Sequence, residues 1–98
     1  MDPIELPIDG ILDLHTFRAK EVPDLLEDYL EACQQSGILS VRIIHGKGTG
    51  ALKKRVQALL KKQQRVASFA DAPPEAGGWG ATLVQLKPAG RTAGENGP

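Results

Sequence analysis

The segment SVRIIHGKGTGALKKRVQALLKK, residues 40–62, joins a short apolar run to a lysine-rich run through a turn that contains three glycines. Residues 40–45 are typical of a buried strand, because Val41, Ile43 and Ile44 give this run its apolar content. The lysine-rich run predicts a helix with an apolar face on one side. That face consists of Leu52, Val56, Leu59 and Leu60. A strand, a glycine turn and a helix in this order indicate an α/β fold.

The flanking segments extend this pattern. Residues 11–15, 66–69 and 81–86 predict three further short strands, with a loop at 72–80. An earlier helix has a face formed by Val22, Leu25, Leu26, Tyr29, Leu30 and Cys33. Pro23 is expected in its first turn and Gly37 at its end. The order β-α-β-α-β-β predicts a compact two-layer sandwich, in which two helices cover a mixed sheet of about four strands. We expect the domain at residues 8–87, after a lead-in (1–7) and before a disordered tail (88–98).

Length and composition exclude several classes of protein. The 98 residues, 41% hydrophobic and 24% charged, suit one globular domain. No apolar run approaches the ~18 residues of a membrane span, so we expect no membrane contact. The first residues do not resemble a secretory signal, and the single Cys33 cannot form an internal disulfide. We therefore expect a cytoplasmic protein.

The net charge of zero conceals a strong segregation of charge. Residues 1–41 carry nine acidic and two basic side chains, whereas residues 42–65 carry eight basic ones and no acid. A basic segment of this kind favours a polyanion such as nucleic acid as the partner. The alternative is an ordinary helix with a solvated lysine face.

Three polar residues end the first two predicted strands. Asp13 and His15 are expected on one face of their strand, with Leu12 and Leu14 on the other. His45 ends the next strand. If these strands are neighbours, Asp13, His15 and His45 meet at one sheet edge, where the carboxylate would orient an imidazole for acid–base catalysis. The alternative is that Asp13 and His15 only hydrogen-bond to the following loop.

The glycine turn (residues 46–50) is a candidate anion site. Glycines let the backbone approach a phosphate, and the N-terminus of the following helix favours negative charge. Lys47 and Lys53 add positive charge. The alternative is a tight turn that needs glycine only for its dihedral angles.

Other ligands are less well supported. Gly46, Gly48 and Ala51, with Asp71 20 residues further on, match a dinucleotide fingerprint, but the chain has no room for a second nucleotide-binding half, so we expect no dinucleotide cofactor. No closed set of four metal ligands is visible. Trp79 is either a stacking platform for a base or a plug at the end of the core.

Three motifs together resemble the small MutS-related (Smr) domain family: LDLH (12–15), RIIHGKGTGAL (42–52) and GGWGATLVQLK (77–87). The middle motif is most like the version at the C-terminus of the second type of bacterial MutS protein. The resemblance implies a fold similar to the C-terminal domain of translation initiation factor three, with both helices on one side of the sheet. It also implies nucleic-acid binding and endonuclease activity on DNA or RNA. The family usually has glycine after LDLH, where this chain has Thr16.

The resulting hypothesis is an endonuclease with a cleft between the LDLH and HGKGTG motifs. In this hypothesis His15, oriented by Asp13, activates water or a ribose hydroxyl, and His45 is the complementary acid or an electrostatic aid. Lys47, Lys53 and the amides of residues 48–50 hold the scissile phosphate. The expected nucleic-acid-binding residues are Gly46, Lys47, Gly48, Thr49, Gly50, Lys53, Lys54, Arg55 and Trp79. The sequence leaves open whether a divalent metal such as magnesium or manganese takes part. The alternative function is a binding module that does not cut nucleic acid.

Overall fold

The computed structural model describes residues 8–48 and 50–89, apart from the side chain of Trp79. The predicted lead-in, residues 90–98 of the predicted tail, and Thr49 lie outside this description. The elements are β1 (Ile11–Asp13), α1 (Val22–Gln35), β2 (Ser40–Ile44), α2 (Ala51–Lys62), β3 (Val66–Asp71) and β4 (Ala81–Leu86). Three short 3-10 turns lie at Ala19–Glu21, Pro74–Ala76 and Gly78–Gly80.

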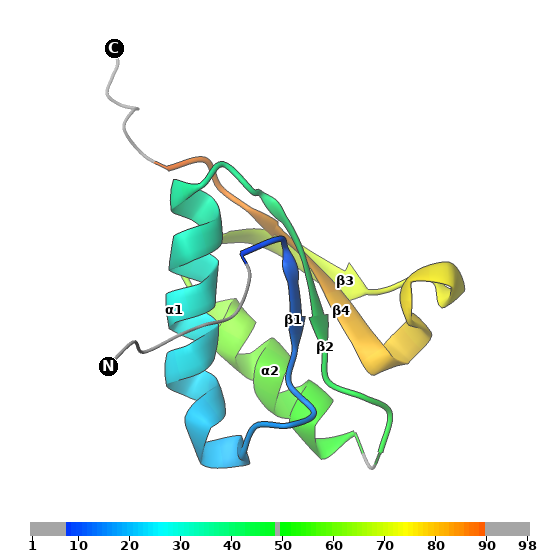
Figure 1. Cartoon of the computed structure of the whole chain (residues 1–98). Coiled ribbons are helices and arrows are strands. Elements are labelled where there is room, and N and C mark those ends of the chain that lie inside the picture. Colours follow the sequence, from blue (N-terminus) through cyan, green and yellow to red (C-terminus); the bar gives the residue numbers. More distant parts are fainter. Residues whose placement is uncertain (1–7, 49, 90–98) are drawn as a thin grey trace.

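The four strands form one mixed sheet in the order β1-β2-β4-β3. β1 and β2 are parallel, while β4 is antiparallel to both of its neighbours, β2 and β3. Both helices pack on the same face of this sheet (Figure 1). The predicted two-layer fold with two helices and four strands is therefore confirmed.

The core lies between the helices and one face of the sheet. Because successive side chains of a strand point to opposite faces, Leu12, Ile43 and Val84 are buried against the helices, whereas Ile11 on the other face is 44% exposed. The helices bury Val22, Leu26, Tyr29, Leu30, Cys33, Val56 and Leu60. Cys33 is fully buried and unbridged, as expected for a core residue.

Strand ends differ from the prediction for identifiable reasons. β1 ends at Asp13 rather than at residue 15, because the Asp13 carboxylate accepts the backbone N–H of His15 at 3.0 Å and turns the chain away from the sheet. β2 ends at Ile44 because the N–H groups of both His45 and Gly46 donate to the Gly80 carbonyl, at 3.0 and 2.8 Å. β3 extends to Asp71, which pairs with Thr82.

Tyr29 fixes the start of β1 against α1. Its hydroxyl oxygen accepts the N–H of Gly10 at 3.1 Å, and its O–H lies 3.1 Å from the Ile11 carbonyl and 3.3 Å from the Asp9 carboxylate. Burial raises the pKa of Tyr29 to about 12, because the charged phenolate would lose its hydration. The hydroxyl thus holds the edge strand that carries the LDLH motif.

One end of the molecule gathers the features that bear on function. The carboxyl ends of β1 and β2 and the N-termini of both helices lie at this end (Figure 1). The dipoles of α1 and α2 therefore place partial positive charge there. In the described part of the chain, no helix has the length and apolar character needed to cross a membrane.

Candidate nucleic-acid interface

The loop from His45 to Gly50 connects β2 to α2 and depends on glycine. Gly46, Gly48 and Gly50 have φ values of 82°, 29° and 86°, which L side chains rarely adopt. A Cβ atom at Gly46 or Gly48 would meet nothing within 4 Å, so backbone conformation rather than crowding requires glycine there. The N–H of Gly46 donates to Gly80, and that of Gly50 donates to the Lys47 carbonyl at 3.1 Å. An anion at this loop would therefore meet Gly48 and the first turn of α2.

A cavity of about 470 Å³ lies beside this loop. Its lining includes three cationic side chains, Lys47, Lys53 and Arg55, and no carboxylate. The first turn of α2 also lines it, and that turn contains no acidic residue. No negative side chain of this turn therefore opposes the helix dipole at the cavity, which favours a bound anion. The full lining is Phe17, Ala19, His45, Gly46, Lys47, Gly48, Gly50, Ala51, Leu52, Lys53 and Arg55.

Asp13 and His15 form an exposed pair. His15 Nδ1 lies 2.7 Å from Asp13 Oδ1, and the same oxygen accepts the backbone N–H of His15. These hydrogen bonds, the backbone one first, hold the pKa of Asp13 below its ordinary value of 3.8. Since a carboxylate can only accept, Nδ1 carries the proton and Nε2 of a neutral ring is left as a base. The side chains are 70% and 45% exposed for His15 and Asp13, so this base faces solvent.

The structure brings Asp13 and His15 together but places His45 apart from them. Asp13 is in register with Ile44 and exposed, on the sheet face opposite the buried Leu12 and Ile43, which pack against α1 and α2. His45 is one residue further along the chain, and its ring reaches Thr82 on the helix-covered face. Neither Asp13 nor His15 lines the cavity, although Phe17, two residues after His15, does. The predicted cleft is therefore not one site: Asp13 and His15 lie on one face of the sheet, and His45 lies with the cavity on the other.

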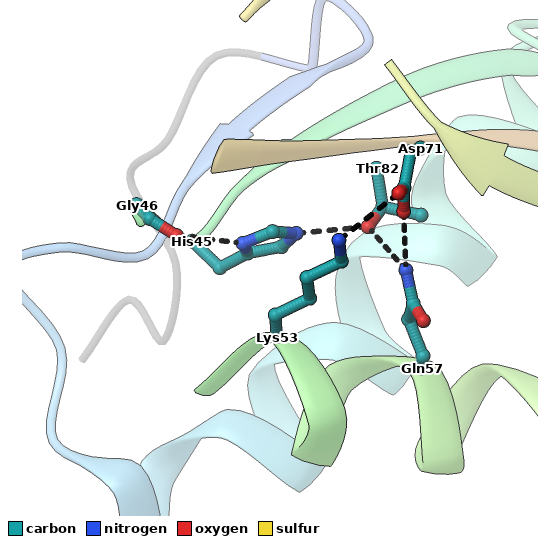
Figure 2. A network of polar contacts seen from close by, with 6 residues as sticks. All are labelled: His45, Gly46, Lys53, Gln57, Asp71 and Thr82. Atoms are coloured by element: carbon teal, nitrogen blue, oxygen red, sulfur yellow. Dashed lines mark hydrogen bonds and ion pairs between the residues drawn. The ribbon is translucent and has the colours of Figure 1, made fainter. Parts of the chain in front are cut away.

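The His45 ring is the centre of a polar network, shown in Figure 2. Nε2 lies 2.8 Å from Thr82 Oγ1, and Nδ1 lies 3.1 Å from the Gly46 carbonyl oxygen. Because a carbonyl can only accept, Nδ1 donates, and in the Nδ1–H tautomer of a neutral ring Nε2 accepts from the Thr82 hydroxyl. Thr82 in turn accepts from Gln57 Nε2 at 3.2 Å. Both nitrogens of the 6% exposed ring are thus hydrogen-bonded.

The network continues to Lys53, which the sequence placed in the phosphate site. Gln57 Nε2 also donates to Asp71 Oδ1 at 3.2 Å, and Lys53 Nζ lies 3.0 Å from Asp71 Oδ2. Lys53, and secondarily Gln57, hold the pKa of Asp71 below its ordinary value. Lys53 is only 16% exposed and shares its charge with Asp71. Its positive charge therefore reaches the cavity partly neutralised.

The other predicted residues differ in how they relate to the cavity. Lys47 and Arg55 line it, while Lys54 is exposed on α2 but is not part of the lining. Thr16 is exposed and also lies outside the lining, so it does not crowd the cavity. The predicted binding roles of Thr49 and of the Trp79 side chain fall outside the described residues. Within the described residues, no three His, Cys, Asp or Glu side chains come together to hold a metal ion.

Sequence reasoning missed three residues of this region: Phe17, Gln57 and Thr82. Gln57 follows Lys53 by four residues on a helix, which places both on one face. Thr82 alternates with Val84 in β4, so its hydroxyl is expected on the buried face. These two sequence patterns could have predicted that Gln57 and Thr82 belong to the network. Phe17 lies in a turn after the first strand, where no periodicity predicts its neighbours.

Comparisons with known proteins agree with this architecture. The family model of the Smr domain matches residues 12–87. Endonuclease MutS2 of Staphylococcus carnosus is 49% identical over 76 residues, and that of Thermus thermophilus is 42% identical over 77 residues. These stretches cover 78% and 79% of this chain, respectively, but the chain spans only about 10% of the length of each relative.

Two solved structures share the fold. The crystal structure of the Smr domain of Thermus thermophilus MutS2 superposes with a TM-score of 0.77 at 40% identity, covering 81% of this chain and 99% of that one. YdaL, a stand-alone small MutS-related protein from Escherichia coli, gives 0.76 at 26% identity, covering 83% and 66%. Since the family model matches most of the chain and the solved domain matches nearly end to end, the chain belongs to the Smr domain family.

Proposed function

We propose that this chain binds nucleic acid at the cavity beside the glycine loop and cuts a phosphodiester bond with His15 as the general base. The observation that carries the proposal is the 2.7 Å contact between Asp13 and His15 at the end of the sheet where α2 begins, with basic side chains and no acidic one in the first turn of that helix. The name of the relatives, Endonuclease MutS2, supports the same activity.

Binding is mainly electrostatic in this proposal. Lys47 and Arg55 contribute their charges directly to the cavity, and the first turn of α2 adds the helix dipole. Lys54, exposed on the same helix, attracts the backbone from a greater distance. Each phosphate contact of this kind displaces a counterion, so affinity falls as salt rises. Lys53 contributes less than its charge suggests, because Asp71 pairs with it.

The chemistry follows from the tautomer of His15. Nε2 takes a proton from the nucleophile, which is water or, on RNA, the ribose 2′-hydroxyl. Asp13 holds the ring in place through Nδ1 and stabilises the imidazolium that forms. As the oxygen of the nucleophile bonds to phosphorus, the P–O bond to the leaving sugar oxygen breaks, and that oxygen takes a proton from the His15 imidazolium or from solvent. The positive charges at this end of the molecule stabilise the charge that develops on the phosphate. His45 is a positioning residue here rather than an acid, because both of its ring nitrogens are engaged.

The proposal leaves open whether cleavage requires a divalent ion such as magnesium or manganese. Such ions prefer several oxygen ligands and are often bound through one or two carboxylates together with substrate phosphates. The described residues provide no group of three or more candidate ligands, and Asp13 already accepts two hydrogen bonds from His15. The proposed steps use only groups of this chain, and cleavage is measured with magnesium, with manganese and with EDTA.

The second candidate is a binding module that does not cut. It is favoured by the position of the Asp13–His15 pair, which lies on a different face from the cavity. In that case the same loop and basic helix hold the nucleic acid, and the pair only closes the turn after β1 through its hydrogen bonds.

The test combines cleavage and binding on the same samples. Supercoiled plasmid, single-stranded DNA and structured RNA are each incubated with magnesium, manganese or EDTA, using the wild-type chain and His15→Ala. We expect cleavage of at least one substrate by the wild-type chain only, with equal affinity for both proteins. Binding without cleavage by either protein would favour the binding module. Cleavage that survives in His15→Ala would refute the assigned base.

A further inference from the structure

We propose that the cavity beside the glycine loop takes one unpaired nucleobase, which stacks on Phe17 while its phosphate lies at the basic side. This inference rests on the proposed function and names its substrate class: nucleic acid with an unpaired nucleotide, such as a bulge or a single-stranded segment. Neither the family match nor the names of the relatives assign such a site.

The cavity is lined by two chemically different kinds of side chain. Phe17, Ala19 and Leu52 are apolar, while Lys47 and Arg55 are cationic. A site that holds only a phosphate needs the charges and the backbone amides but gains nothing from an aromatic ring. An apolar wall beside an anion site matches a ligand with both a flat apolar part and a phosphate, which is a nucleotide.

The size of the cavity agrees with such a ligand. Its volume of about 470 Å³ falls within the range of roughly 300–1,000 Å³ that is typical of small-molecule sites. A base inside a duplex is paired along one edge and stacked on both sides, so it cannot enter such a cavity without leaving the helix. A base that is already unpaired enters at lower cost, which makes unpaired substrates preferred.

Phe17 is held firmly enough to act as a platform. Its backbone N–H donates to the Leu14 carbonyl at 3.0 Å, and its half-buried ring packs against the core while it also lines the cavity. A ring that is fixed before binding loses little conformational entropy when a base stacks on it. Stacking on an aromatic ring accepts every base, so the site selects unpaired nucleotides without reading their sequence.

The chain contains a matched control for this role. Phe69 is its only other phenylalanine and is also half-buried against the core, but it lies in β3 and does not line the cavity. Phe17→Leu and Phe69→Leu remove the same aromatic ring from similar surroundings and keep an apolar side chain. Only Phe17→Leu removes a stacking surface from the cavity.

The experiment measures affinity by fluorescence anisotropy at one salt concentration for three duplexes. The first is fully paired, the second carries one bulged nucleotide, and the third carries an abasic site at the bulge; each is made as DNA and as RNA, and its integrity is checked on a gel. We expect Phe17→Leu to weaken binding to the bulged duplex by about fivefold to tenfold, with binding to the paired duplex changed less than about twofold. Phe69→Leu should change neither.

The abasic duplex tests the same contact without altering the protein. We expect the wild-type chain to lose affinity by a similar factor when the base is absent, and Phe17→Leu to lose nothing further, since the two changes remove one interaction. Equal wild-type affinity for the bulged and abasic duplexes would overturn the inference, even if Phe17→Leu failed to fold. If the wild-type chain bound none of these nucleic acids, the proposed function itself would fail.

Discussion

Replacing Thr82 with valine removes one hydroxyl from the centre of the polar network and preserves the shape of the side chain. Thr82 is fully buried, and its Oγ1 contacts His45 Nε2 at 2.8 Å and Gln57 Nε2 at 3.2 Å. In Thr82→Val both contacts are lost. Gln57 keeps its bond to Asp71, but Nε2 of the buried His45 ring has no partner.

The expected cost follows from that unpaired nitrogen. A buried acceptor without a donor costs about 1–3 kcal/mol, and the added methyl group of valine offsets part of it. We therefore expect the free energy of unfolding to fall by about 1–2 kcal/mol. For a domain of this size, that loss lowers the Tm by roughly 5–15 °C. Thr82→Ser is the matched control, because it retains the hydroxyl and loses only a methyl group.

Two measurements check this prediction. Chemical denaturation compares the unfolding free energies of the wild-type, Thr82→Val and Thr82→Ser chains. Nitrogen-15 NMR of the histidine rings identifies the tautomers, and only His15 and His45 contribute signals. We expect the proton on Nδ1 of His45 in the wild-type and serine chains. An Nε2–H tautomer of His45 in the wild-type chain, or a valine variant as stable as the wild type, would refute the hydrogen bond that we assign from the Thr82 hydroxyl to His45 Nε2.

Three further predictions concern stability and binding. Because burial raises the pKa of Tyr29 from 10 to about 12, the unfolded chain releases this proton first. The stability that Tyr29 contributes is complete below pH 10 and falls by about 1.4 kcal/mol per pH unit up to about pH 12. The difference in unfolding free energy between the wild type and Tyr29→Phe should therefore shrink over that range, and parallel pH curves for the two chains would contradict this prediction. Gly46→Ala, at φ 82°, should cost about 1–2 kcal/mol in thermal unfolding, and a Tm equal to that of the wild type would show that the loop relaxes freely. Arg55→Gln, which removes a cation from the cavity, should lower the salt slope of nucleic-acid binding by about 1, while Lys61→Gln, at the far end of α2, leaves the slope unchanged. Equal effects of the two substitutions would argue against an interface at the cavity.

The order and type of the elements could be predicted because local patterns determine them. The final strand has the predicted bounds, because its apolar run follows Gly80 directly and ends before Lys87 and Pro88. The alternation also predicted that Asp13 and His15 share a face opposite Leu12 and Leu14, and in the structure the two leucines are buried while Asp13 and His15 are exposed. These features depend on neighbours within a few residues.

The arrangement of the site could not be predicted, because it depends on contacts far apart in sequence. His45 and Thr82 are 37 residues apart, and only the pairing of β2 with β4 brings them together. Alternation along β2 places His45 on the same face as the buried Val41 and Ile43, whereas Asp13 is in register with Ile44, on the other face. The register between β1 and β2 comes from contacts far apart in sequence, so the sequence suggested one cleft where the structure has a pair on one face and a cavity on the other.

The most direct test of the central claim is single-turnover cleavage by the wild-type chain and His15→Gln on whichever substrate the wild type cuts. Glutamine retains a polar side chain of similar length but cannot act as a base at neutral pH. With His15 as the general base, the rate falls at least about 100-fold while the dissociation constant stays within about twofold. Equal cleavage rates for the two proteins would contradict the account, because the Asp13–His15 pair would then be only a turn-closing contact.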